Sequence, residues 1–224
     1  MLISKFHYEN LRIIFTTYFE HSIEAAEVLA DIPIWGIALD FVHGKKNIEA
    51  LEYVNLQQNG ILNIADFGCG TGIQTLLLAE HLKARITSVD LFPKFLNKLN
   101  ERAKNSALSN KIDTRVEDLN DLSIEPYSLD LIWSEGAIYN IGFEKGLKDW
   151  RRYLKPGGLL VVSEITWLTG SRPPELQEYW GQEYPEIDVA SSKISLLEKF
   201  GYSPIGYFVL PEHCWTDNYY TPIQ

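Results

Sequence analysis

The feature that most constrains the fold of this chain is a glycine-dense turn between two apolar runs. Residues 61–67 read Ile-Leu-Asn-Ile-Ala-Asp-Phe, residues 68–72 read Gly-Cys-Gly-Thr-Gly, and residues 73–78 read Ile-Gln-Thr-Leu-Leu-Leu. This order predicts a strand, a loop and a helix. Because glycine has no Cβ, the chain can turn sharply there and lie close to a ligand. In doubly wound α/β folds, such a turn is where nucleotide-like cofactors bind, and we expect its amide groups to hold the ligand.

Strands and helices alternate along the chain after this turn. Further strands are expected at residues 85–90, 111–116, 129–134, 159–165 and 203–210. Helices are expected at residues 72–82, 93–107, 143–154, 175–182 and 190–200. The alternation predicts an α/β fold with a Rossmann-like, doubly wound and mostly parallel sheet that has helices on both faces.

The first 60 residues carry a different pattern. Apolar residues recur at helical spacing over residues 2–31, and a second helical stretch is expected over residues 46–56. No strand is therefore expected before residue 61. Since no linker or repeat divides the chain, we expect a single domain over residues 1–224.

The spacing of the glycines separates two kinds of cofactor. A dinucleotide fingerprint requires G-x-G-x-x-G, but here the third glycine comes one residue early and Ile73 takes its place. A nicotinamide dehydrogenase is disfavoured for this reason, and a glycine-rich turn without a ligand stays an alternative. The pattern Asp66-x-Gly68-x-Gly70-x-Gly72 instead resembles the first motif of the class I S-adenosylmethionine-dependent methyltransferases.

Later segments extend this resemblance. Residues 130–134 and 154–164 are similar to the fourth and sixth motifs of that superfamily. Residues 133–144, 184–188 and 209–217 resemble, more narrowly, the UbiE-like or type 11 small-molecule methyltransferases, including uncharacterised bacterial members. The resemblance implies S-adenosylmethionine as cofactor, S-adenosylhomocysteine as product, and in-line transfer of the sulfonium methyl to an unidentified small molecule.

The resemblance also divides the expected domain into parts. Residues 1–60 would form a helical N-terminal lid, residues 61–165 the cofactor-binding core, and residues 166–224 the C-terminal helices, strand and tail. Sheets of this class usually close with an antiparallel strand, and only one clear strand follows the last helices. We expect either an irregular strand from the tail or a sheet that lacks its last antiparallel strand, which would leave an open edge on the strand at 159–165.

Two acidic residues after neighbouring strands are candidates for contacts with the adenosine part. Asp90 ends the second strand about 20 residues after the turn, where a carboxylate can accept from both ribose hydroxyls; the alternative is a cap on the next helix. The resemblance implies an adenine contact by Asp118, with Leu119 supplying an N–H and an apolar surface, and a capping Asp118 is the alternative. The expected cofactor-binding residues are Asp66, Gly68, Cys69, Gly70, Gly72, Asp90, Leu91, Asp118, Leu119 and Ser134.

The catalytic residues are less constrained. An O- or C-acid acceptor must lose a proton, and the candidate bases are Glu135 and Tyr139 after the fourth strand, His43 and His213. Trp167, Trp215 and Tyr219 are candidates for the wall of a substrate pocket, although core packing is the default for aromatic residues. Since no base stands out, the alternative function is a cofactor-binding protein without turnover, such as a sensor or a partner subunit.

Charge and cysteine content limit the partners. A net charge of −10 disfavours nucleic acid, whose phosphates need clustered Lys and Arg. The 2 cysteines suggest neither a disulfide framework nor a metal site, and a reducing cytoplasm is the simplest location. No apolar run reaches the roughly 20 residues that span a bilayer, and no secretory signal precedes the first strand. We expect a monomer or homodimer that acts on a small molecule, without metal, nucleic acid or membrane.

Overall fold

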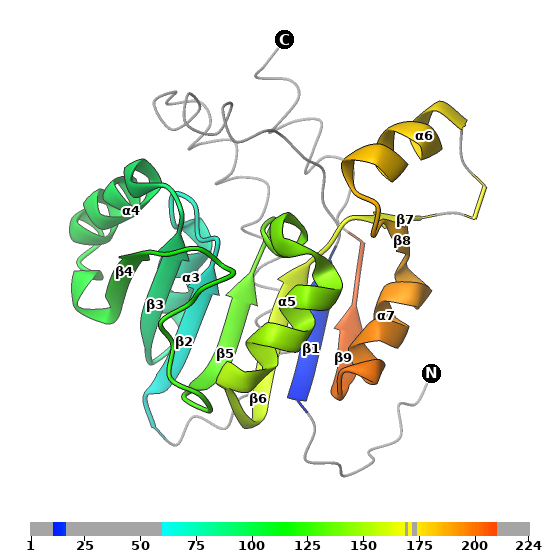
Figure 1. Ribbon diagram of the computed structural model, residues 1–224. Helices are drawn as coiled ribbons and strands as arrows, with labels where there is room; N and C mark the ends of the chain where they lie inside the picture. The colour runs from blue at the N-terminus through cyan, green and yellow to red at the C-terminus, as the bar shows by residue number, and fades with distance from the viewer. Residues whose placement is uncertain (1–10, 17–59, 169, 172–173, 210–224) are drawn as a thin grey trace.

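A seven-stranded sheet organises the computed structural model of this protein (Figure 1). The structure describes residues 11–16, 60–168, 170–171 and 174–209. The strands of the sheet are β1 (Leu11–Thr16), β2 (Leu62–Phe67), β3 (Ala84–Asp90), β4 (Ile112–Val116), β5 (Leu129–Ser134), β6 (Leu154–Ser163) and β9 (Tyr202–Tyr207). Their order is β4-β3-β2-β5-β6-β1-β9, and every pairing in it is parallel.

Helices cover both faces of the sheet. The α-helices are α3 (Ile73–His81), α4 (Pro93–Asn105), α5 (Phe143–Trp150), α6 (Pro174–Glu183) and α7 (Ala190–Lys199). Short elements are the 3₁₀ turns η1 (Ser109–Lys111), η2 (Ile138–Ile141) and η3 (Arg151–Tyr153) and the two-residue pair β7 (Thr166–Trp167) and β8 (Asp188–Val189). None of the helices in the described ranges is long and apolar enough to span a membrane.

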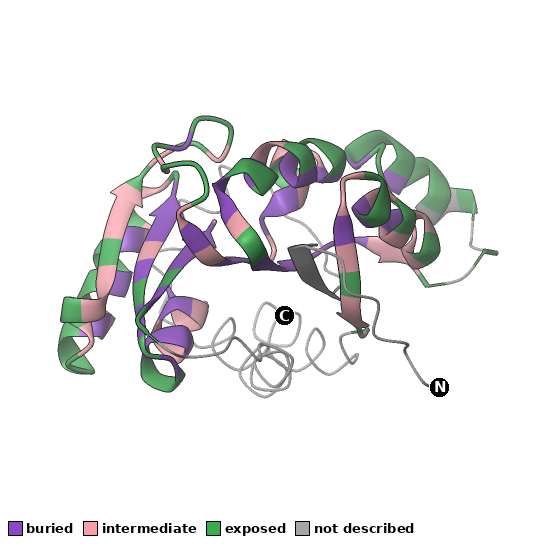
Figure 2. Cartoon of the chain, turned by 90° about the horizontal axis from the view of Figure 1, so that it is seen from below, coloured by how far each residue is buried: buried purple, intermediate pink, exposed green. Residues whose placement is uncertain are grey.

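Two apolar clusters hold these layers together, one on each face. On the first face, Leu78 of α3 and Leu82, directly after α3, pack against alternate residues of the central strands, among them Ile64 and Ile86. On the opposite face, the residues of α5 and α7 meet the other alternate residues of the same strands, among them Phe67. Both faces of the central strands are therefore buried, as Figure 2 shows, which is the environment that parallel strands need.

The predicted α/β fold is confirmed. β5 has the predicted bounds. Both ends of β2, β3, β4 and β9 lie within three residues of the predicted ends. β6 begins at Leu154, before the predicted start, because the chain already pairs with Leu129 there. The helices follow the predicted ranges, with the last turn of the predicted 143–154 helix formed by η3.

The helix predicted over residues 2–31 is wrong at Leu11–Thr16, which forms β1. β1 lies between β6 and β9 and pairs with both in parallel, so the edge of β6 that was expected to be open is paired. The sequence Leu-Arg-Ile-Ile-Phe-Thr is rich in β-branched and aromatic residues, and a run of six is too short for its periodicity to separate a strand from a helix. The other residues of the expected lid and the tail after residue 209 lie outside the described residues.

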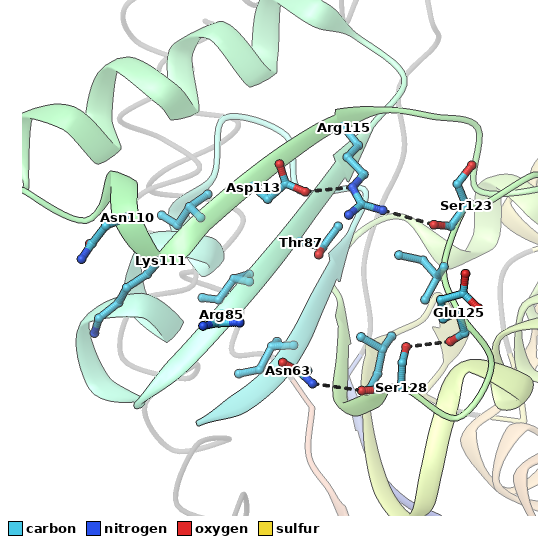
Figure 3. A pocket seen from close by; sticks show the side chains of 15 residues that line it. Asn63, Arg85, Thr87, Asn110, Lys111, Asp113, Arg115, Ser123, Glu125 and Ser128 are labelled. Atoms are coloured by element: carbon cyan, nitrogen blue, oxygen red, sulfur yellow. Dashed lines mark hydrogen bonds and ion pairs between the residues drawn. The ribbon is translucent and has the colours of Figure 1, made fainter. Parts of the chain in front are cut away.

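The sheet carries one open groove at the start of its strands. The connection from β4 to β5 contains no helix, and the polar side chains of β3 and β4 face a cavity of about 570 Å³ (Figure 3). Arg115 points to Asp113 and to the carbonyl of Ser123 across it. The groove lies at the amino ends of the strands, whereas ligands of open parallel sheets bind at the carboxyl ends. The carboxyl ends of the strands are therefore the expected place of the functional site.

Candidate functional site

The glycine turn at residues 68–72 lies at the carboxyl end of β2. Gly68, Gly70 and Gly72 all have positive φ, at 72°, 53° and 86°. A Cβ added at Gly68 would overlap the Cβ of Ala137, and one added at Gly72 would overlap the side chain of Leu99. A Cβ at Gly70 would meet nothing within 4 Å. Gly68 and Gly72 therefore permit close packing within the protein, whereas Gly70 faces open space.

The backbone N–H groups of this turn are used inside the protein. Gly68 and Cys69 donate to the carbonyl of Val89 at 2.8 and 3.0 Å, and Gly72 donates to the carbonyl of Cys69 at 2.9 Å. Gly70 donates to Oδ2 of Asp90 at 2.8 Å. These four N–H groups hold the shape of the turn, and the expected contact of the turn with a ligand stays a prediction.

Three carboxylates lie around the turn. Asp66 of β2 is 2% exposed and accepts the hydroxyl of Thr75 at 2.6 Å. Asp90, at the end of β3, accepts the N–H groups of Gly70 and Phe92 through its two oxygens. Glu135, directly after β5, is half-buried and accepts the side-chain amide of Gln74 at 3.1 Å. The three acids come from three neighbouring strands, so the fold brings them together although they are distant in sequence.

Burial and mutual repulsion disfavour the charged forms of these acids. Burial raises the pKa of Asp66 to about 7; the hydroxyl of Thr75 lowers it, and the charges of Glu135 and Asp90 raise it. Burial also raises the pKa of Asp90, although the N–H groups that its oxygens accept lower it. The pKa of the buried Cys69 thiol is raised by burial and then by the charges of Asp66 and Asp90. A cation bound at the turn would relieve this repulsion.

Of the two residues expected around adenine, Leu119 lies beside the turn. Leu119 is half-buried, and its Cδ1 lies 3.7 Å from the position that a Cβ would take at Gly68. Asp118 is exposed, and its Oδ1 accepts the backbone and side-chain N–H groups of Asn120 at 2.8 and 3.0 Å. This is the capping arrangement, although the second carboxylate oxygen is not used in it. Leu91 is 53% exposed next to Asp90.

Ser134 is fully buried at the end of β5. Its hydroxyl donates to the carbonyl of Phe67 at 3.0 Å and so ties β5 to the last residue of β2. This contact occupies the hydroxyl proton and places the side chain inside the sheet. The structure thus gives Ser134 a supporting position below the turn.

The loop after β5 passes over the turn. The N–H of Gly136 donates to the hydroxyl of Ser163 at 2.6 Å, and Ala137 fills the space above Gly68. Tyr139 is half-buried in η2, with its ring edge-on to the ring of Tyr184. Of the candidate bases, Glu135 contacts Gln74 of the helix after the turn, whereas the ring of Tyr139 packs against the cluster that contains Tyr184. His43 and His213, like Trp215 and Tyr219, lie outside the described residues. Trp167 is half-buried in the cluster that contains Tyr184.

A buried ionisable cluster at the end of β6 was missed by the sequence reasoning. Glu164 accepts the hydroxyl of Tyr184 and the ammonium of Lys193 through the same oxygen, and these three residues are 0%, 6% and 1% exposed. Glu164 directly follows an apolar strand, at the sheet edge that carries Asp90. An acidic residue at that position was the signal that could have found it. In the described ranges, no group of three or more His, Cys, Asp and Glu could hold a metal ion.

Comparison with known families gives two matches along the chain. The family described as "Methyltransferase domain" matches residues 65–162, which include the turn, Asp90, and the loop after β5. The family described as "Cobalamin-independent synthase, N-terminal domain" matches residues 3–65. The chain is also 35% identical over 83 residues to a 5-methyltetrahydropteroyltriglutamate–homocysteine methyltransferase of Desulforamulus reducens, covering 36% of this chain and 11% of that protein.

Other relatives match a larger share of the chain. A tocopherol O-methyltransferase of Arabidopsis thaliana is 27% identical over 171 residues, or 75% of this chain and 44% of that protein. A demethylmenaquinone methyltransferase of Bacteroides fragilis is 33% identical over 105 residues, or 46% of this chain and 43% of that protein. The chain spans less than half the length of each of these relatives.

Solved structures agree on the fold. Phosphoethanolamine N-methyltransferase 2 of Haemonchus contortus, solved with phosphomonomethylethanolamine and S-adenosylhomocysteine, has a TM-score of 0.63 at 23% identity and covers 75% of this chain and 42% of that chain. A putative sarcosine dimethylglycine methyltransferase of Galdieria sulphuraria has a TM-score of 0.60 at 19% identity, with 70% and 58% covered. Residues 65–162, the segment around the glycine turn, therefore match the methyltransferase domain family, and the solved methyltransferase structures share the fold of this chain.

Proposed function

We propose that this chain binds S-adenosylmethionine at the turn 68–72 and transfers its methyl group to a small-molecule acceptor. The observation that carries this proposal is the set of carboxylates around a turn in which four N–H groups are already bonded inside the protein. A dinucleotide pyrophosphate needs free N–H groups and is repelled by carboxylates. A ligand with a sulfonium and an ammonium group gains from the same charges. The ligand favoured by this site is thus an adenosyl cation.

Each expected contact has a geometric basis in the described residues. Oδ2 of Asp90 accepts the N–H of Gly70 and Oδ1 accepts that of Phe92, and because a carboxylate oxygen can accept more than one hydrogen bond, both also suit the ribose hydroxyls. The open side of Gly70 gives the ligand room to approach the backbone. Leu119, whose side chain lies beside Gly68, suits the adenine ring, and we assign the adenine amino group to the neighbouring carboxylate of Asp118.

The chemistry of the transfer divides between cofactor and protein. S-adenosylmethionine, when bound, supplies an electrophilic methyl group. The chain must orient the acceptor in line with the methyl–sulfur bond and exclude water, which can supply up to roughly 7–11 kcal/mol of the barrier reduction. Glu135 and Tyr139 lie on the loop over the turn and are the described groups that we assign to the acceptor side.

The acceptor itself is proposed only as a class. Relatives of this segment bear the names of an O-methyltransferase and of a demethylmenaquinone methyltransferase, and a structural neighbour is an N-methyltransferase. A screen should therefore include phenols, quinols and amines. We expect a monomer or homodimer that acts in the cytoplasm without nucleic acid, a proposal supported by the net charge of −10 and the sparse cysteines.

Isothermal titration calorimetry with S-adenosylmethionine tests the binding. We expect saturable binding to the wild type and at least a roughly tenfold weaker affinity for Asp90→Asn, which loses a charged acceptor for the ribose. Asp113→Asn, the same change on an exposed residue of β4, is the matched control and should bind like the wild type. Tighter binding of a nicotinamide dinucleotide, or no binding of S-adenosylmethionine, would contradict the proposal.

Turnover is tested separately from binding. S-adenosylhomocysteine formation is measured with each member of the acceptor panel. A methylated product from any acceptor supports transfer, and binding without product across the panel supports the alternative of a cofactor-binding protein without turnover.

A further inference from the structure

The carboxyl end of β6 holds the loop after β5 at two points. Ser163, the last residue of β6, accepts the N–H of Gly136 at 2.6 Å. Glu164, the next residue, accepts the hydroxyl of Tyr184, and the ring of Tyr184 meets the ring of Tyr139 at a centroid distance of 6.2 Å and an angle of 67°. The loop is therefore fixed both through its backbone and through an aromatic side chain.

Lys193 completes this arrangement from α7. Its ammonium donates to Oε1 of Glu164 at 2.6 Å and to the hydroxyl of Tyr184 at 3.2 Å. It also lies 4.8 Å from the centre of the Phe143 ring and 4.9 Å from that of Tyr184. Because a buried charge is costly without its partner, Glu164 and Lys193 hold each other and Tyr184 in one arrangement.

The donors of the cluster converge on one oxygen of Glu164. The other oxygen, Oε2, is buried and has no hydrogen-bond partner in the part of the chain that the structure describes. Burial raises the pKa of Glu164 to about 7; Lys193 and Tyr184 lower it, and the charge of Glu186 raises it. Uptake of a proton by Glu164 would weaken its bonds to Lys193 and Tyr184.

The cluster also joins two segments of the sequence that the resemblance had singled out, residues 133–144 and 184–188. The rings of Tyr139 and Tyr184 make one contact between these segments. A second contact is the hydrogen bond from the N–H of Glu144, at the start of α5, to the carboxylate of Glu186 at 3.2 Å. The methyl transfer proposed above assigns no role to residues 184–188. Their contacts with the loop after β5 give them one.

From these contacts we propose that Glu164, Tyr184 and Lys193 form a positioning unit that sets the orientation of Tyr139 at the acceptor side of the site. The inference rests on the proposed function, since it concerns the same site. Glu164 and Lys193 are buried and act through Tyr184, so they are positioning residues. Tyr139 is the residue of this set that lies on the loop over the glycine turn.

The test places 3-fluorotyrosine at position 139 of the full chain and records its ¹⁹F NMR signal. For the wild type we expect one resonance that moves when S-adenosylhomocysteine is added and that titrates with a midpoint near pH 7, the pKa of Glu164. In Tyr184→Phe the ring stays but its bond to Glu164 is lost, so the resonance should broaden or split and lose this titration. Its affinity for S-adenosylhomocysteine should stay within about twofold, because Tyr184 does not touch the turn.

Two further variants separate positioning from folding. Glu164→Gln alone leaves Lys193 charged and buried, which is destabilising, so the double variant Glu164→Gln with Lys193→Met removes both charges together. It should fold and show no titration near pH 7. Tyr179→Phe makes the same change at a residue of α6 that is 50% exposed, and Glu144→Gln neutralises an exposed partner of Lys199. Both controls should keep the wild-type signal, and the fluorotyrosine's own ionisation is common to all variants.

The outcomes are distinguishable. A Tyr139 resonance that Tyr184→Phe leaves unchanged, or that still titrates near pH 7 in the double variant, overturns the positioning role. S-adenosylhomocysteine binding by calorimetry is unaffected by that result. A wild type that binds no S-adenosylhomocysteine contradicts the proposed function, and the positioning role falls with it.

Discussion

The carboxylate of Asp90 accepts the backbone N–H of Gly70 at 2.8 Å, so that the end of β3 holds the turn that follows β2. The same carboxylate accepts the N–H of Phe92 at 2.9 Å and thereby fixes the start of α4. Asp90 is therefore both the cap that the sequence offered as an alternative and a wall of the proposed cofactor site. A carboxylate oxygen can accept more than one hydrogen bond, so the two roles are compatible.

Loss of this carboxylate should loosen the turn. Asp90→Ala removes the acceptors of two half-buried N–H groups, and an unsatisfied buried donor costs about 1–3 kcal/mol at most sites. We expect a lower free energy of unfolding by about that amount in urea denaturation at pH 7. Asp113→Ala, on the exposed pair with Arg115, should change stability by less than about 1 kcal/mol. Equal effects of the two substitutions would contradict a structural role of Asp90 in the turn.

Gly70 offers a way to separate backbone strain from ligand contact. Its φ of 53° should cost an alanine about 1–2 kcal/mol in stability. Gly157 has a φ of 74° and an equally open surrounding, but it lies before the buried part of β6, far from the turn. We expect Gly70→Ala and Gly157→Ala to lose similar stability, while only Gly70→Ala weakens S-adenosylmethionine binding. Unchanged affinity in Gly70→Ala would show that the ligand does not approach this backbone.

The pH dependence of stability follows from two raised carboxyl pKa values. Asp66 and Glu164 have pKa values of about 7 in the folded chain, against 3.8 and 4.5 unfolded. Between these values the folded chain binds more protons than the unfolded chain, so stability falls as pH rises from about 4 to 7, by at most about 1.4 kcal/mol per pH unit for each group. Asp66→Asn should flatten this fall in denaturation measured from pH 5 to 8. A wild-type stability that rises with pH over this window is the opposite result.

Cofactor binding should release a proton from the same acid. A cation at the turn favours the charged form of Asp66 and so lowers its pKa from about 7. At pH 7 we expect a fraction of a proton to leave on binding of S-adenosylmethionine, measured as a dependence of the calorimetric enthalpy on the ionisation enthalpy of the buffer. Asp66→Asn should abolish that dependence while it keeps an acceptor for Thr75. Buffer-independent enthalpy in the wild type would place the bound charge away from Asp66.

The N-terminal strand should be required by the sheet. β1 pairs with β6 and with β9, so deletion of residues 1–16 exposes the edges of both strands. We expect a less stable chain that associates at micromolar concentration, detected by light scattering and thermal melting. A truncated chain with the melting temperature of the full chain would show that β1 adds nothing to the core, in line with its match to a different family.

The sequence predicts most of the sheet because its strands are continuous apolar runs bounded by turn residues. Residues 129–134 were placed with the right bounds for this reason. β1 was missed, since six residues that suit either state carry little periodicity and its partners lie more than 140 positions away. Its place in the sheet depends on tertiary pairing, which local patterns do not contain.

The site, like the sheet, could be predicted from the sequence only in part. Asp90 and the glycine turn follow from motif spacing, because the carboxyl ends of neighbouring parallel strands lie together. The internal use of the turn's N–H groups could not be foreseen, since it depends on the carbonyl of Val89 across the sheet. Tyr184 and Lys193 lie 20 and 29 residues after Glu164 in the sequence, so no spacing rule joins the three residues.

The most direct measurement is a crystal structure of the full chain with S-adenosylhomocysteine. Our account predicts the ribose hydroxyls at the two oxygens of Asp90 and the ligand backbone against the open side of Gly70. A ligand bound elsewhere, or a hollow above the turn filled by the protein's own side chains, would contradict it.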